Sequence, residues 1–400
     1  MIKIGNLEID KFYLGDKSDA KIYLGDVKVW PQQGEEEPET YPYAFQRVSR
    51  GGSAYTVDCN STSSNTITSG DTRSGLVNAE IGSSTKDNTP VSVVFGDCCQ
   101  TIGDNVCSGW TYLTSVTISD NVTSLGANSF YNTSRIEHLK IGSGITQIPT
   151  YAFNNTCRSG SIKPDLDLSK NVGLNVGDNG FQYCYFNNVI FPNNCTLSPN
   201  SFGYCSASTL SFGSGTIISK VGTYSSTFNY SNISNIDLNG VTLIGDYAFR
   251  KASGFTSITI PPSVTTFGSH AFESVSGLNS VTIDYASNAT LKSSQFTDSS
   301  ITSLTIGSHP TSIGDSMFRK CTKLTTLVIP SNISSIDGYA FDGCTGLRSI
   351  TVESTTPPTL GSNVFNNTSC PIYVPSGSVN AYKAASGWSN YKSRIQAIPT

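Results

Sequence analysis

The sequence predicts a mainly β solenoid in which coils of roughly 23 residues stack on one another. A phenylalanine recurs at that interval through most of the chain, and each interval contains a segment of alternating apolar and polar residues. The length agrees, because 400 residues exceed what one ordinary globular core needs and stacked units are then favoured. We therefore expect about twelve such units with terminal segments that close the stack.

The recurring phenylalanine keeps its register along the chain, and we call each aligned residue a peg. Neighbouring pegs are 21 to 28 residues apart, a regularity that chance would not maintain. A period in this range is typical of leucine-rich-repeat arrays. The pegs are Cys107, Phe130, Phe153, Phe181, Phe202, Phe228, Phe249, Phe272, Phe296, Phe318, Phe341 and Phe365.

Each unit combines a predicted strand with a predicted turn. Residues 278–283 and 324–329 place apolar side chains at alternate positions, which is the period of a half-buried strand. The Ile-Gly-Asp segments, as at residues 244–246 and 313–315, allow glycine to turn the chain and aspartate to cap a short helical turn that carries the peg. We thus expect one parallel sheet on one face and short helical turns on the other.

Composition narrows the classes of partner. Charged residues make up only 14% of the chain, against about 25% in average proteins. The net charge is −4, which does not indicate a basic surface patch, so nucleic acid and anionic membranes are not expected partners. No apolar run is long enough to span a bilayer, and membrane insertion is not expected either.

Several of the eleven cysteines share one place in the repeat. Cys184, Cys205, Cys321 and Cys344 each follow a peg by three residues. A column of small, half-apolar side chains indicates packing rather than a disulfide framework.

The first 30 residues contain a short duplication. FYLGD at residues 12–16 and IYLGD at residues 22–26 each alternate into a Gly-Asp turn, which predicts a hairpin or a three-strand module. A module this small cannot bury a sufficient core, so it is expected to dock on a partner or on its own copies. The candidate anchoring residues are Tyr13, Leu14, Tyr23, Leu24 and Trp30.

The rest of the chain is expected to consist of a linker, two caps and the repeats. An acidic, proline-rich linker is expected at residues 31–42, followed by an irregular cap at 43–90 with strand-like pieces at 54–58 and 76–81. The repeats then occupy residues 91–369, and a closing cap occupies residues 370–400.

The unit Ile-Gly-Asp-x-x-Phe-x-x-Cys-x-x-Leu-x-x-Ile-x-Ile-Pro resembles the BspA-type leucine-rich repeat over roughly residues 91–400. The tail that begins CPIYVPSGSVNAYKAASGW is similar to the closing cap of that family, which implies a strand and a short helix that cover the last coil with Tyr382 and Trp388. The resemblance implies adhesion and recognition, as in surface proteins of gut and oral bacteria, and it brings no catalytic residues.

The amino-terminal 30 residues resemble the short leaders of structural proteins in phages of Bacteroides-like hosts, including crAss-like phages. The start of the chain also lacks the basic, apolar and small-residue segments of a secretory signal. Both features favour a virion component over an exported bacterial adhesin.

Catalytic and metal sites are not indicated. His138, His270 and His309 lie in different repeats without metal-ligand spacing, and no nucleophile elbow has a suitable context. We expect no enzyme activity and no cofactor.

The segment 154–235 is the most irregular part of the array, and aromatic residues gather there. A change in repeat length in a solenoid usually forms a loop on its surface, where tyrosines can contact sugar or protein. Alternatively, the same side chains could fill wider coils. A hydroxyl ladder on the strand face, including Ser257, Thr259, Ser280, Thr282, Ser303 and Thr305, could also bind or could reflect β-propensity and solubility alone. The candidate binding residues are Tyr183, Tyr185, Tyr204, Tyr224 and Tyr230.

Together these observations predict a non-enzymatic phage virion protein, a fibre or decoration of the head or tail. Residues 1–30 would attach it to other virion proteins, and the solenoid would meet a host-surface glycan or protein. The alternative is a bacterial cell-surface adhesin of the same repeat family. Whether the chain forms a homo-oligomer is open, since no heptad run marks a trimerisation element.

Overall fold

The structure is a computed structural model. It describes residues 91–97, 99–218 and 226–399 and, before them, the backbone of seven strands between residues 2 and 67. Contacts divide the chain into two units, residues 1–42 and residues 43–400, which are considered separately.

The first unit contains two antiparallel strand pairs. The partners are β1 (Ile2–Ile4) with β2 (Leu7–Ile9), and β3 (Ile22–Leu24) with β4 (Val27–Trp30). Of the candidate anchoring residues, Tyr23 and Leu24 lie in β3 and Trp30 ends β4. Tyr13, Leu14 and the predicted linker lie outside the described residues.

The second unit begins with a hairpin that joins the solenoid. β5 (Gln46–Gly51) pairs antiparallel with β6 (Ala54–Cys59), and β6 pairs in parallel with β8 (Val91–Phe95). The strand-like piece expected at residues 76–81 lies outside the described residues.

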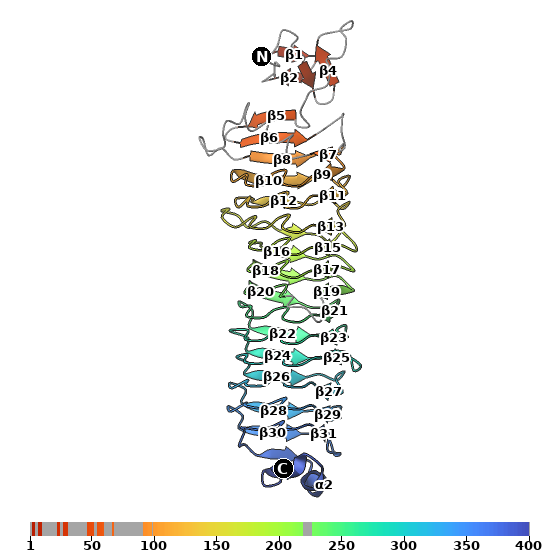
Figure 1. The fold of residues 1–400 in the computed structure, drawn as a ribbon, viewed down its shortest axis with the longest axis vertical. Helices are drawn as coiled ribbons and strands as arrows, with labels where there is room; N and C mark the ends of the chain where they lie inside the picture. The colour runs from red at the N-terminus through yellow and green to blue at the C-terminus, as the bar shows by residue number, and fades with distance from the viewer. Residues whose placement is uncertain are drawn as a thin grey trace. The chain divides into compact units, whose positions relative to one another are not determined.

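A first row of parallel strands follows the stack of coils (Figure 1). It is divided into four sheets, with breaks after β12, β20 and β26. The row continues from β8 with β10 (Leu113–Ile118), β12 (His138–Lys140), β14 (Leu166–Asp167), β16 (Asn188–Ile190), β18 (Ser206–Ser211), β20 (Asn232–Asp237), β22 (Ser257–Ile260), β24 (Ser280–Ile283), β26 (Ser303–Ile306), β28 (Thr326–Ile329), β30 (Ser349–Val352), β32 (Ile372–Val374) and β33 (Ile395–Ala397).

A second row of shorter parallel strands lies at the Ile-Gly-Asp segments, where the sequence predicted only turns. The isoleucine or its equivalent points inward, and the backbone pairs with the next coil; Ile148, for example, is buried and pairs with Val176. The row consists of β7 (Thr66–Ile67), β9 (Thr101–Ile102), β11 (Ser124–Leu125), β13 (Gln147–Ile148), β15 (Asn175–Val176), β17 (Thr196–Leu197), β19 (Thr216–Ile218), β21 (Val241–Ile244), β23 (Thr266–Phe267), β25 (Thr290–Leu291), β27 (Ser312–Ile313), β29 (Ser335–Ile336) and β31 (Thr359–Leu360).

The phenylalanine pegs form one continuous spine, which confirms the predicted solenoid. From Phe130 to Phe365 every peg is at most 1% exposed, and neighbouring ring centroids are 4.9 to 5.9 Å apart in stacked pairs. Stacked aromatic pairs of this kind contribute about 0.5–1.5 kcal/mol each beyond their buried area.

The peg-bearing turns are β-turns rather than the short helical turns expected. The backbone is left-handed two residues before the peg in eleven of the twelve coils, and two residues after it in all twelve. A left-handed residue on each side prevents helical hydrogen bonding from continuing. The peg's N–H donates instead to the next coil, as from Phe249 to the carbonyl oxygen of Ala271 at 2.7 Å.

The cysteine column is a packing feature, and it also carries hydrogen bonds. The nine cysteines whose side chains the structure describes are free and buried. The Sγ atoms of Cys184 and Cys205 each donate to the carbonyl oxygen of the peg in the preceding coil, Phe153 and Phe181, at 2.9 Å. Ser231 and Ser299 do the same through Oγ at 2.8 Å. Ala252 and Val275 are buried at the same position in two other coils, so a donor there adds a hydrogen bond between coils but is not required.

The aspartate of the Ile-Gly-Asp segment links neighbouring coils. Asp104 Oδ1 accepts a hydrogen bond from Ala127 N–H at 2.7 Å, and Asp246 Oδ1 accepts one from Ser269 N–H at 2.7 Å. The sequence suggested capping within one coil and did not indicate this inter-coil role.

The carboxyl-terminal segment covers the last coil. After β32 the chain forms α2 (Val379–Ala384) between two short 3-10 turns, η1 (Ser376–Ser378) and η2 (Trp388–Tyr391). Tyr382 and Trp388 are fully buried, and the Trp388 ring lies 5.9 Å from that of Phe365. The spine thus ends on an aromatic side chain from outside the repeat.

Replacing one peg should destabilise the stack strongly. Phe249→Ala removes a ring that contacts Phe228 and Phe272 at 4.9 Å each, so we expect a loss of about 3–5 kcal/mol in the free energy of unfolding, measured by guanidinium titration. The exposed-site control Thr326→Ser should change it by less than about 0.5 kcal/mol. A loss similar to the control's would contradict a continuous spine.

The buried thiols predict sensitivity to alkali. Burial raises the pKa of Cys195, Cys205 and Cys344 from 9.0 to about 12. Because the pKa is higher in the folded state, this contribution to stability is complete below pH 9 and is lost as the pH rises toward 12. Urea titrations should show the free energy of unfolding falling over that interval, and less steeply for Cys205→Ser; an unchanged value would contradict it.

Candidate functional site

Three of the five candidate binding tyrosines form a single stack. Tyr183, Tyr204 and Tyr230 each follow a peg by two residues, in three consecutive coils. Their ring centroids are 5.0 and 5.1 Å apart, and the planes of the second pair, Tyr204 and Tyr230, are almost parallel, with an angle of 2° between them. We call these three residues the tyrosine ladder.

The ladder lies on the outside of the coils and does not fill their interior. Tyr204 is 40% exposed and Tyr230 is 45% exposed, whereas the pegs two residues earlier are buried. Because the ring faces cover one another, the parts left to contact a partner are the ring edges and the phenol groups.

Each ladder residue has a left-handed backbone. The φ angles of Tyr183, Tyr204 and Tyr230 are 63°, 57° and 54°. A bulky residue in this region is unusual and costs about 1–3 kcal/mol, while Asn or Gly adopts it more easily. Other coils place Asn or Gly at the same position, as at Asn132 and Gly343, or Ser, Asp or Lys, as at Lys251. The left-handed backbone belongs to every coil, but three tyrosines in succession at this position, with Tyr204 and Tyr230 exposed and Tyr183 half-buried, are not required by the fold.

A cation covers each end of the ladder. The Arg158 guanidinium lies 5.6 Å from the Tyr183 ring centroid, and Lys251 Nζ lies 5.2 Å from that of Tyr230 and donates to its hydroxyl at 3.1 Å. Cation–π contacts at exposed sites contribute about 0.5–1 kcal/mol. Sequence reasoning missed both cations, although Lys251 follows its peg by two residues and so continues the ladder's column.

The other two candidate tyrosines are not part of the ladder. Tyr185 forms a parallel bridge with Ser206 at the strand side, and Lys163 Nζ lies 5.7 Å from its ring centroid. Tyr224 lies outside the described residues.

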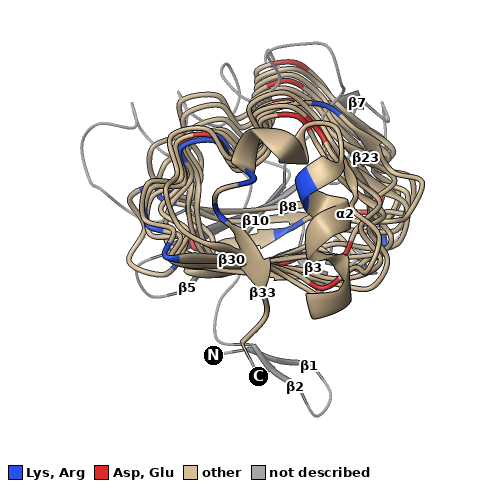
Figure 2. Ribbon diagram, turned by 90° about the horizontal axis from the view of Figure 1, so that it is seen from below, with Lys and Arg blue, Asp and Glu red and all other residues tan. Residues whose placement is uncertain are grey.

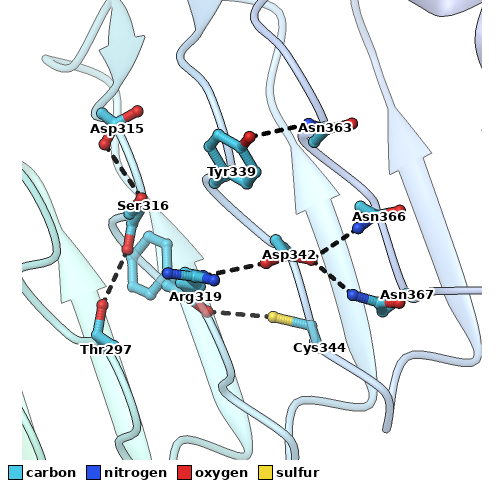
Figure 3. Close-up of polar contacts among 11 residues, drawn as sticks. Thr297, Asp315, Ser316, Arg319, Tyr339, Asp342, Cys344, Asn363, Asn366 and Asn367 are labelled. Atoms are coloured by element: carbon cyan, nitrogen blue, oxygen red, sulfur yellow. Dashed lines mark hydrogen bonds and ion pairs between the residues drawn. The ribbon is translucent and has the colours of Figure 1, made fainter.

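A second polar cluster lies on the peg-bearing turns of coils near the carboxyl end, and its side chains bind one another (Figure 3). Asp342, with its side chain 7% exposed, accepts hydrogen bonds from Arg319 at 3.0 Å, Asn366 at 3.3 Å and Asn367 at 2.9 Å. The Arg319 guanidinium also lies 5.8 Å from the Tyr339 ring centroid. This network joins three coils, and its role in stacking is sufficient to account for it.

The histidines and charged residues are dispersed. His309 Nδ1 lies 2.9 Å from Asp284 Oδ1, and the His270 ring stacks on Tyr247 in another coil. Within the described parts of the chain, no three His, Cys, Asp or Glu side chains are grouped to hold a metal ion. Figure 2 shows acidic and basic positions interrupting a largely uncharged ribbon. None of the helices in those parts has the length and hydropathy needed to cross a bilayer.

A substitution in the ladder should affect stability much less than one in the adjacent spine. In Tyr204→Asn, relief of the left-handed backbone offsets the lost ring contacts, so we expect the free energy of unfolding to change by less than about 1 kcal/mol. Phe202→Ala should lose about 3–5 kcal/mol. Comparable losses in guanidinium titrations would show that the ladder is a structural element.

Comparison with known protein families identifies the same repeats. Models of the BspA type leucine rich repeat region match residues 80–171, 174–299 and 242–371, in six copies. No curated protein matches the chain.

Solved structures with similarity include a leucine-rich repeat protein from Bacteroides ovatus, at 17% identity and a TM-score of 0.43, over 90% of this chain and 100% of that one. A leucine rich cell surface protein from Faecalibacterium prausnitzii is 19% identical, with a TM-score of 0.35 over 91% and 100%. The pneumococcal vaccine antigen PcpA is 11% identical, with a TM-score of 0.36 over 88% and 95%. The family model covers most of the chain, with its repeats in the segment where the pegs stack, and this chain belongs to the BspA-type leucine-rich-repeat family.

Proposed function

We propose that this chain is a non-enzymatic binding protein that contacts its partner through the tyrosine ladder. The observation that carries the proposal is the presence of tyrosine, with stacked rings, at the left-handed position of three consecutive coils. Every coil is left-handed at this position, and other coils place Gly, Asn, Asp, Ser or Lys there, so the fold does not require tyrosine. A row of aromatic edges, phenol groups and two cations provides apolar contact area together with hydrogen-bond donors, as binding hot spots do.

The state of the buried thiols does not favour nucleophilic catalysis by them. Burial raises the pKa of Cys157, Cys184 and Cys321 well above 9.0, so these thiols stay protonated at neutral pH. A catalytic cysteine requires the opposite shift, because the thiolate is the nucleophile. The cysteines therefore serve the coil stack.

We further propose that the chain is a phage virion component attached through residues 1–30. The paired strands of the first unit have three or four residues each, and two-stranded pairs of this length are marginally stable alone. Docking on a partner sheet would supply the missing burial. A bacterial cell-surface adhesin is the second candidate, supported by the repeat family that the chain shares with such proteins.

Deleting residues 1–30 separates attachment from folding. We expect the shortened chain to keep the circular dichroism spectrum and unfolding midpoint of the solenoid and to lose its association with phage particles in sedimentation assays. Retained association would rule out the proposed anchor. Display on bacterial cells that carry no phage would favour the adhesin.

Replacing the ladder should abolish partner binding without unfolding the chain. The triple variant Tyr183→Asn, Tyr204→Asn, Tyr230→Asn should reduce binding of the labelled full chain to Bacteroides cells at least about tenfold in flow cytometry. Tyr339→Asn is the matched control, because Tyr339 is also exposed and left-handed but lies on another part of the turn face. Equal binding by the triple variant and the control would refute the ladder's role.

A further inference from the structure

A notch opens in the strand face where the first row of strands is interrupted. β20 and β22 follow one another along the row but belong to different sheets. The notch between them has a volume of about 350 Å³ and is lined by Ile236, Asp237, Leu238, Asn239, Ser257, Ile258 and Thr259.

The local sequence explains the interruption. At the end of β20, Asp237 Oδ1 accepts a hydrogen bond from Asn239 N–H at 2.9 Å, which turns the chain away from the strand direction. Directly after β22, Pro261 has no N–H to extend pairing. Each strand pairs on its other side, β20 with β18 and β22 with β24. The start of β20 is bridged to Ser253, and the notch lies beyond that bridge, between the later part of β20 and β22.

The lining side chains are suited to a polyhydroxylated ligand. The Asp237 carboxylate can accept hydrogen bonds from adjacent hydroxyl groups, and the Asn239 amide can donate and accept. Ser257 and Thr259 add hydroxyls, while Ile236 supplies an apolar surface for the less polar face of a sugar ring. One carboxylate without a lining cation disfavours an anionic ligand.

Two rows of hydroxyl groups lead away from the notch. Ser257, Ser280 and Ser303 are register partners on successive strands, and so are Thr259, Thr282 and Thr305. Parallel strands are about 4.8 Å apart, which is close to the length of one pyranose unit, and side chains two positions apart share the outer face. The rows thus offer hydroxyl partners at a repeated interval beside the notch.

We propose that the notch and these two rows bind a neutral, linear polysaccharide, with one sugar unit held at Asp237 and the following units lying across the serine and threonine rows. This site is on the strand face and is independent of the tyrosine ladder on the turns. An extended peptide is less suited, because it would need alternating side-chain pockets, whereas the rows present small hydroxyls.

Affinity electrophoresis of the full chain tests the proposal. Native gels would contain hydroxyethylcellulose, laminarin, galactomannan or amylose as neutral polymers, polygalacturonate or heparin as acidic ones, and β-casein as an extended polypeptide. We expect at least one neutral polymer to retard the chain. Asp237→Asn should weaken that association about tenfold, since it removes a charged acceptor.

Variants that remove single hydroxyl groups, with matched controls, test whether the association depends on the serine and threonine rows. Thr259→Val and Thr282→Val keep the side-chain shape but remove a hydroxyl, and each should weaken association several-fold. Thr351→Val, on a strand of a different sheet, and the ladder triple variant should leave it unchanged. The proposal is overturned if no neutral polymer retards the chain, if only acidic polymers or casein do so, or if Asp237→Asn binds like the parent.

Discussion

Contact between aromatic rings in neighbouring coils is the interaction on which the rest of this structure depends. A coil of about 23 residues cannot bury its own apolar face, so each peg is enclosed only because the coils above and below cover it. The inter-coil backbone bonds, the thiol donors and the aspartate bridges all require the same spacing. They fix the register that the ring stacking makes favourable.

That spacing also determines what the surface can present. A side chain at one position of the repeat recurs beside its equivalents, so a single choice of residue becomes a row. On the turns, tyrosine at the left-handed position after the peg produces the ladder. On the strands, serine and threonine produce hydroxyl rows. The two surfaces differ in chemistry because one follows the strained turns and the other a relaxed pleated strand.

Much of this arrangement could be predicted from the sequence, because periodic features repeat their signal. The pegs, the alternating strands and the packing of Cys184 and Cys205 all followed from alignment of the units. The type of turn could not be predicted: the sequence shows glycine or asparagine beside the pegs in several coils but tyrosine or lysine in others, and the inter-coil hydrogen bonds that hold them left-handed are long-range.

The candidate site was less predictable for the same reason. The sequence shows the tyrosines of segment 154–235 as one aromatic cluster. Only the structure shows that Tyr183, Tyr204 and Tyr230 stack on one another while Tyr185 lies at the strand side. Arg158 comes from a bend five residues after its peg and has no counterpart column to reveal it. The notch at Asp237 arises from a missing pairing, which no residue pattern records directly.

The closure of the spine by Trp388 leaves the number of coils independent of how the ends are built. Excising the residues between two equivalent pegs, such as Phe318 and Phe341, joins matching positions, so the ring stacking can continue across the junction while the stack loses one coil. The number of coils can thus change by duplication or loss of a gene segment, and the separation of the two ends of the solenoid changes with it while the tyrosine ladder and the serine and threonine rows stay intact.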